Sequence, residues 1–93
     1  MNDTIKEQIE RAAAILKAAG AKEVYAFGSA ARGLLRDDSD VDLAVSGLPP
    51  DRFFKAMGEA TSVLERSLDL VDLDEDTPFT RYLREEEELE RVA

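Results

Sequence analysis

Three aspartates lie inside or at the edge of apolar, strand-like segments, where this residue type is uncommon. Asp40 and Asp42 stand two residues apart in one segment, and Asp69 lies between two leucines in another. Because alternate side chains of a strand point to the same face, Asp40 and Asp42 should share a face. Carboxylates are costly to bury without a partner, and such hard oxygen ligands select Mg²⁺ or Mn²⁺. The aspartates therefore predict a divalent-cation site, which two ions could share.

A candidate phosphate-binding segment lies at the end of an earlier apolar run, at Gly28 and Ser29. Glycine lets a ligand approach the backbone closely. A serine that opens a short helix can hold a phosphate with its hydroxyl and with the first backbone N–H groups. Arg32, one turn later, could add positive charge to the same anion or form a surface ion pair with Asp37 or Asp38.

The composition of the 93-residue chain excludes several other kinds of chemistry. There is no Cys and no His, so disulfides, thiolate nucleophiles, imidazole bases and their metal sites are ruled out. The net charge of −9 argues against a broad nucleic-acid-binding surface, so no direct nucleic-acid partner is expected. Any catalysis must use carboxylates, hydroxyls or a metal held by oxygen.

The elements that must position these residues alternate between helices and strands. Apolar spacing and cap signals predict helices over 4–19, 51–66 and 77–91, and strands over 23–28, 41–45 and 68–73. Residues 29–39 are expected to form a short helix or turn and then a polar loop. The order α-β-α-β-α-β-α predicts an α/β (α+β) fold, with a small mixed three-stranded sheet and flanking helices, in a single domain over 1–93.

This order should bring the candidate residues together. Ten residues separate Ser29 from Asp40, and a loop of that length can return the chain antiparallel, with the Gly-Ser end beside the Asp end. The helix over 51–66 is long enough for a parallel crossover, which would place the strand carrying Asp69 about 4.8 Å from that of Asp42. Asp72 and Asp74 are the nearby competitors for the role of Asp69.

Several further expectations concern the surface and the location. The run Glu85–Glu88 is expected to be a solvated helix face. No apolar run approaches the ~20 residues that span a bilayer, and the first residues do not resemble a signal peptide, so a cytoplasmic protein without a membrane partner is expected. No residue that reads a nucleobase is identifiable, and the aromatic residues are expected in the core: Tyr25, Phe27, Phe53, Phe54 and Phe79.

The combination of Gly28-Ser29, ten intervening residues and Asp40-Val41-Asp42 resembles the signature of the DNA polymerase β nucleotidyltransferase superfamily. The surrounding FGSAARGLLRDDSDVDLAV and the later LDLVDL resemble its minimal nucleotidyltransferase branch, over nearly the whole chain. The resemblance implies the polymerase β-like fold. It also implies that Asp40 and Asp42 bind two Mg²⁺ ions, that Asp69 binds one of them and helps to deprotonate the attacking hydroxyl, and that Gly28 and Ser29 hold the triphosphate.

The resemblance also implies a function and a partner. Minimal nucleotidyltransferases of this kind act as antitoxins paired with HEPN-domain ribonuclease toxins, and the family transfers AMP from ATP to a hydroxyl side chain of the toxin. Since 1–93 offers no second domain to hold an acceptor, the acceptor is expected on another protein. Two alternatives remain open: an antitoxin that acts by binding without catalysis, and a small-molecule nucleotidyltransferase completed by another subunit.

Overall fold

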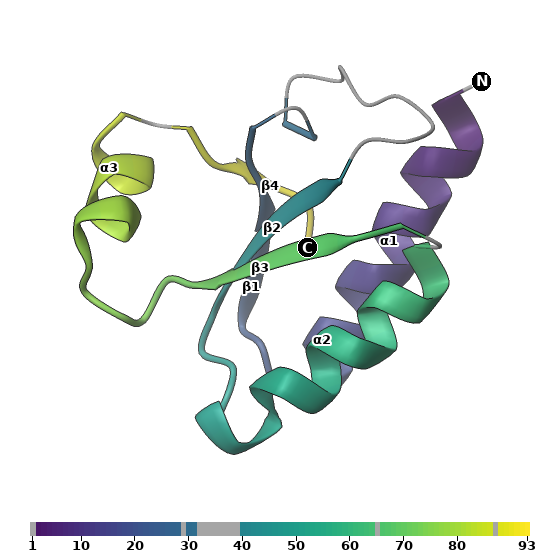
Figure 1. Ribbon diagram of the computed structural model, residues 1–93, viewed down its shortest axis with the longest axis horizontal. Helices are drawn as coiled ribbons and strands as arrows, with labels where there is room; N and C mark the ends of the chain where they lie inside the picture. The colour runs from purple at the N-terminus through teal and green to yellow at the C-terminus, as the bar shows by residue number, and fades with distance from the viewer. Residues whose placement is uncertain (1, 29, 32–39, 65, 87) are drawn as a thin grey trace.

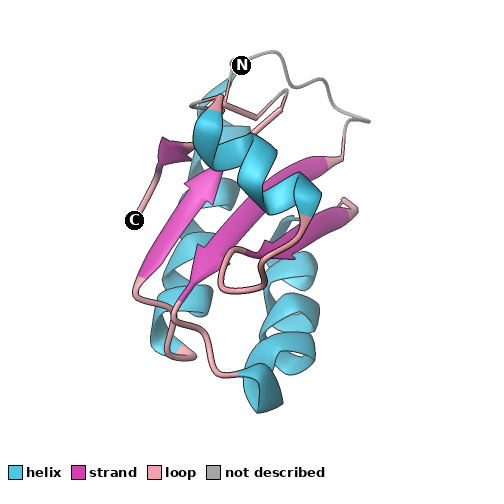
Figure 2. Ribbon diagram, turned by 90° about the vertical axis from the view of Figure 1, so that its left-hand side faces the viewer, coloured by secondary structure: helices cyan, strands magenta, loops and turns pink. Residues whose placement is uncertain are grey.

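The computed structural model describes residues 2–28, 30–31, 40–64, 66–86 and 88–93, with side chains from residue 5 onward. The elements follow the order α1 (Asn2–Ala18), β1 (Glu23–Ala26), β2 (Val41–Ser46), α2 (Pro50–Leu64), β3 (Leu68–Asp72), α3 (Pro78–Glu85) and β4 (Glu90–Arg91). One sheet has the strand order β3-β2-β1-β4. Helices α1 and α2 cover one face of the sheet and α3 lies against the other (Figures 1 and 2). The mixed α/β fold is confirmed.

The pairing of the first three strands also agrees with the sequence prediction. β1 and β2 are antiparallel, with Ala26 opposite Leu43. β2 and β3 are parallel and are connected through α2, with Asp42 opposite Asp69. The chain therefore reverses its direction between β1 and β2, and it passes through α2 from β2 to the parallel strand β3. Both connections agree with those expected from the lengths of the connecting segments.

The end of the chain differs from the prediction, because a fourth strand replaces the last part of the expected helix. Helix α3 ends at Glu85 instead of near Arg91, and β4 pairs antiparallel with the free edge of β1. The run Glu85–Glu88 thus begins at a helix C-terminus, where the helix dipole disfavours negative charge. The backbone N–H of Val92 then donates to the carbonyl of Val24 at 2.9 Å. The β4 segment covers an edge that would otherwise present unpaired backbone groups.

The two faces of the sheet bury cores of different size. Alternate residues of β2, namely Val41, Leu43 and Val45, point toward α1 and α2 into the larger core. The opposite face carries a smaller buried cluster of Phe27, Ala44, Leu73 and Leu83, which contains the contact with α3. By the same alternation Asp42 lies on this second face, two residues before Ala44 and near the N-terminal end of β2. Helix α3 and the acidic residues therefore share one face of the sheet.

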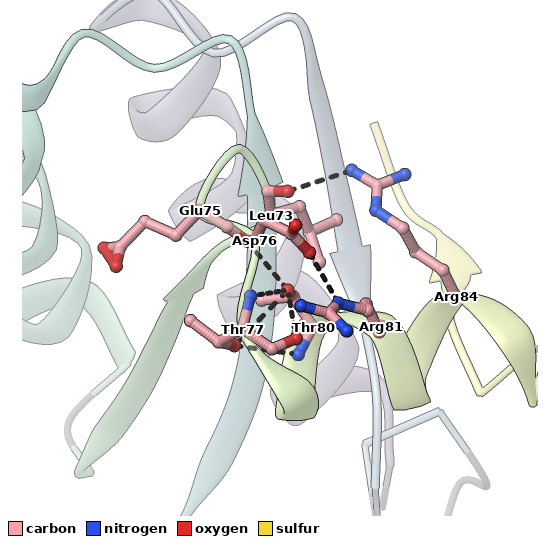
Figure 3. Close-up of polar contacts among 7 residues, drawn as sticks. All are labelled: Leu73, Glu75, Asp76, Thr77, Thr80, Arg81 and Arg84. Atoms are coloured by element: carbon pink, nitrogen blue, oxygen red, sulfur yellow. Dashed lines mark hydrogen bonds and ion pairs between the residues drawn. The ribbon is translucent and has the colours of Figure 1, made fainter.

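Helix α3 is held at its first turn by a compact network of hydrogen bonds (Figure 3). Thr77 is the N-cap, and its side chain accepts from the backbone N–H of Thr80 at 3.1 Å. The buried hydroxyl of Thr80 accepts from the N–H of Thr77 at 3.0 Å and donates to the carbonyl of Glu75 at 2.7 Å. At the last turn, Arg84 donates to the carbonyl of Leu73 at 3.1 Å. These contacts fix the position of α3 over the sheet.

Replacing Thr80 by valine should lower the free energy of unfolding by about 1–2 kcal/mol, since the N–H of Thr77 and the carbonyl of Glu75 both lose their hydrogen-bond partner at the first turn of α3. Urea denaturation measures the effect. The matched control is Thr61→Val in α2, whose hydroxyl donates only to a carbonyl of its own helix, at 2.7 Å from Met57. An equal loss in the two variants would contradict a special role for the Thr80 hydroxyl.

Among the described residues, the helices lack the length and the apolar character that a bilayer-spanning helix needs.

Candidate active site

Two of the three predicted carboxylates are neighbours on adjacent parallel strands. Asp42 on β2 and Asp69 on β3 are register partners, and their side chains lie on the face opposite α1 and α2. Partners on adjacent strands are about 4.8 Å apart, so the two carboxyl groups are within reach of each other. Asp42 is half-buried, whereas Asp69 is exposed. The strand pairing thus places one shielded and one accessible carboxylate side by side.

Asp40 lies directly before β2 and is exposed. Its charge is close enough to act on Asp42. Among the described residues, however, no three acidic side chains are arranged as a group that could hold a metal ion. The structure therefore brings Asp42 and Asp69 together, and the convergence of Asp40 with them at one point stays a prediction.

Gly28 lies against the carboxylate of Asp42. The residue before it, Phe27, donates its backbone N–H to the carbonyl of Asp42 at 3.1 Å and so continues the ladder between β1 and β2. Gly28 itself has a φ of 62°, and a Cβ at this position would lie 2.7 Å from Oδ2 of Asp42. Both the backbone conformation and the lack of space require glycine here. The expected meeting of the Gly-Ser end with the Asp end is thus present at Gly28.

The other predicted ligands of the phosphate lie outside the described residues. These are Ser29 and Arg32, together with the alternative ion-pair partners of Arg32, Asp37 and Asp38. Their roles stay predictions.

The two competitors of Asp69 have local structural roles at the far end of the sheet. Asp72 is the register partner of Val45 and accepts from the backbone N–H of Asp74 at 2.9 Å. Asp74 accepts from the backbone N–H of Gly47 at 2.8 Å. Both therefore stabilise the turns beyond β2 and β3, and neither lies beside Asp42 in the strand register.

Burial raises the pKa of Asp42 above its usual range, and the charge of Asp69, a hydrogen bond to Asp69 and the charge of Asp40 raise it further. Among the described residues, none of these influences on the Asp42 pKa comes from a positive side chain. An anionic, oxygen-rich pair without an internal cation fits a hard divalent ion such as Mg²⁺ or Mn²⁺. When bound, such an ion would neutralise negative charge on a phosphate group.

The raised pKa of Asp42 predicts how stability depends on pH. The stabilisation that this group contributes is fully present below its unfolded pKa of about 3.9, and is lost as the pH rises through the higher folded pKa. At neutral pH and without divalent cations, Asp42→Asn should therefore raise the melting temperature, by on the order of a few degrees. The gain should shrink as the pH falls to about 4.

Thermal melts in a chelator at both pH values test this expectation. Glu59→Gln, which changes an exposed carboxylate of α2, is the control for the loss of one negative charge. A lower melting temperature for Asp42→Asn at neutral pH would contradict the account.

Comparison with known proteins identifies the family. Residues 5–89 match the family model described as polymerase beta, nucleotidyltransferase. The chain belongs to this nucleotidyltransferase family. The resemblance seen in the sequence is thus confirmed, and the family supports nucleotidyltransferase activity in general terms. No curated protein matches the chain.

Solved structures share the fold over nearly the whole chain. A structure described as a minimal nucleotidyltransferase is 25% identical with a TM-score of 0.70, and the match covers 96% of this chain and 94% of that one. A toxin–antitoxin structure with AMP-PNP is 22% identical with a TM-score of 0.70, covering 92% and 70%. A mutant of the toxin–antitoxin MntA-HpeT is 21% identical with a TM-score of 0.69, covering 91% and 71%. The two toxin–antitoxin structures are less than 25% identical to this chain, so their likeness shows that they share its fold and nothing more.

The prediction for the aromatic residues is wrong in two cases. Phe27 is buried, and Tyr25 and Phe53 pack partly buried against the two cores. Phe54 is 75% exposed and Phe79 is 47% exposed. For Phe79 a signal was available: the cap at Thr77 sets the helical phase, in which the buried residues of α3 are Thr80 and Leu83. This phase leaves Phe79 on a flank of the helix.

Proposed function

We propose that this chain transfers a nucleoside monophosphate, AMP from ATP, to a hydroxyl group of a partner protein with the help of Mg²⁺. The observation that carries the proposal is that three groups lie together. The carboxylates of Asp42 and Asp69 are paired on neighbouring strands, and the backbone of Gly28 lies against Asp42. A half-buried carboxylate with a like-charged neighbour and a raised pKa is typical of functional sites, and a bound cation would relieve the repulsion within this pair. Membership of the nucleotidyltransferase family supports nucleotidyl transfer as the reaction at this site.

Each residue has a role in this proposal. Asp40, Asp42 and Asp69 would hold the divalent ions. Gly28, with Ser29 and Arg32, would bind the triphosphate. The acceptor oxygen forms a bond to the α-phosphorus, the bond from that phosphorus to the bridging oxygen breaks, and pyrophosphate leaves. Asp69 is the exposed member of the pair, so it is the carboxylate best placed to receive the acceptor proton.

The proposed partner is a toxin. The matched structures include toxin–antitoxin complexes, which supports a toxin partner for this chain as well. We further propose, from the sequence resemblance, that this toxin is a HEPN-domain ribonuclease and that its modification neutralises it in the cytoplasm. The net charge of −9 would favour a basic contact surface on that partner.

The test is incubation of the chain and Mg²⁺ with a candidate toxin, the product of a neighbouring gene, using ATP labelled at either the α- or the γ-phosphate. The proposal predicts that the α-label but not the γ-label appears on the toxin, and that Asp40→Asn/Asp42→Asn abolishes labelling. Transfer of the γ-label would identify a kinase instead. A stable complex that carries no label with any nucleoside triphosphate would identify an antitoxin that acts by binding.

A growth assay separates catalytic from stoichiometric neutralisation. If modification neutralises the toxin, cells that express it should be rescued by the wild-type chain and not by Asp42→Asn at equal abundance. Full protection by Asp42→Asn would contradict the catalytic account. Labelling of a small alcohol or an aminoglycoside in place of the toxin would favour the small-molecule alternative.

A further inference from the structure

Helix α3 presents two exposed aromatic side chains on one flank. Phe79 is 47% exposed and Tyr82 is 52% exposed. They are three residues apart, so they are neighbours on the helix surface. The residues that face the sheet are Thr80 and Leu83, and neither aromatic residue belongs to the buried part of the helix. The two rings therefore form an aromatic surface, and none of the described residues covers it fully.

Contacts at both sides of α3 show which way this flank faces. The ring of Phe79 lies edge-to-face with the ring of Phe27, with centroids 5.8 Å apart and an interplanar angle of 68°. Phe27 stands opposite Asp42 in the strand ladder and directly precedes Gly28. On the other flank, Arg84 donates to the carbonyl of Leu73, at the far end of β3. The aromatic flank thus faces the end of the sheet that carries Gly28 and Asp42.

The contact with Phe27 leaves much of the Phe79 ring available. Phe27 is buried, whereas about half of Phe79 remains open to solvent. An aromatic ring in this condition can stack on the flat face of a nucleobase, and such stacking accepts any base because every base has a π-face. Phe79 contacts Phe27, which directly precedes Gly28, the glycine proposed to bind the triphosphate. The base is joined covalently to that triphosphate through the ribose, so it must lie nearby.

We propose that Phe79, extended by Tyr82, is the surface on which the nucleobase of the bound nucleoside triphosphate stacks. This inference rests on the proposed function, since it assigns a subsite of the same site. Stacking contributes roughly 5- to 150-fold to affinity per base. Because a ring face does not distinguish bases by hydrogen bonds, the contribution should be similar for ATP and GTP.

The test compares two ligands that differ in the base: ATP, and inorganic tripolyphosphate, which has none. Their affinities are measured by calorimetry with Mg²⁺ for the wild type and for Phe79→Leu. Leucine keeps an apolar contact with Phe27 but offers no ring. The proposal predicts that Phe79→Leu weakens ATP about tenfold and leaves tripolyphosphate within about twofold. Phe79→Trp should retain the affinity for ATP.

Two controls separate stacking from general effects. Phe54→Leu changes an exposed phenylalanine of α2, on the helix layer across the sheet, and should leave both ligands unaffected. Tyr82→Ala removes the second ring, which takes no part in the buried contacts of α3, and should weaken ATP by a smaller factor than Phe79→Leu.

The outcomes distinguish this inference from the proposed function. Equal losses of ATP and tripolyphosphate in Phe79→Leu, or no loss of either, would overturn the stacking role while leaving the triphosphate site intact. Unchanged nucleotide affinity with a weakened complex with the toxin would assign the aromatic surface to the acceptor protein, and would also overturn it. Failure of the wild type to bind either ligand would instead contradict the proposed function itself.

Discussion

Asp42→Asn should lower the rate of nucleotide transfer by about 10³-fold or more, with the fold intact. Asparagine has nearly the same shape as aspartate, so the contact with Gly28 is retained. The change removes the negative charge that is paired with Asp69 on the neighbouring strand and that the charge of Asp40, before β2, also influences. Loss of this charge weakens the binding of a divalent ion, and the charge of the phosphates is then less well neutralised.

The control for this variant lies on the same sheet. Asp72→Asn changes a carboxylate at the far end of β3, whose contact is with the backbone N–H of Asp74. Its transfer rate should stay within about threefold of the wild type, because a few tenths of a kcal/mol at a remote turn change a rate little. An Asp42→Asn chain that keeps more than a tenth of the wild-type rate would place the metal site elsewhere.

Gly28→Ala should both destabilise the chain and stop the transfer. The left-handed φ of 62° is unfavourable for alanine, and the new methyl group would lie 2.7 Å from Oδ2 of Asp42, so one of the two must move. We expect a loss of about 1–3 kcal/mol in the free energy of unfolding, measured by urea denaturation. The transfer rate should fall at least 10²-fold, since a displacement near 1 Å in a catalytic group has that effect.

A double-mutant cycle separates the strain from the clash. In an Asp42→Ala background the clash disappears, so Gly28→Ala should then cost only the part of the energy that comes from the backbone conformation. The matched control is Gly58→Ala in α2, where a Cβ meets nothing within 4 Å and the change should stabilise the helix by about 1 kcal/mol. Equal costs of Gly28→Ala in both backgrounds would contradict the proposed contact with Asp42.

The sequence is sufficient to predict the elements that build the site. The periodicity of β2 assigns Asp42 to the face opposite Val41 and Leu43, and the length of α2 implies the parallel crossover that pairs Asp42 with Asp69. Both inferences depend only on strand alternation and connection length, which are local properties. The pairing of the two carboxylates follows from them directly.

Features that depend on tertiary structure are not predictable in this way. β4 consists of Glu90–Arg91 alone, has no alternating pattern, and forms because β1 has a free edge. The contact of Gly28 with Asp42 requires a particular φ and the register of two strands. The exposure of Phe79 depends on how α3 is seated over the sheet, which the hydrogen bonds of Thr80 and Arg84 determine.

The cation site can be located by the broadening that Mn²⁺ causes in the backbone amide NMR signals of nearby residues. We expect the signals of Gly28, Asp42 and Asp69 to be lost first, while those of Gly47 and Asp74 at the far end of the sheet persist. In Asp42→Asn this selectivity should disappear, and in Asp72→Asn it should remain. Broadening that centres on the acidic run at the end of α3, or that is unchanged in Asp42→Asn, would contradict a metal site at the paired carboxylates.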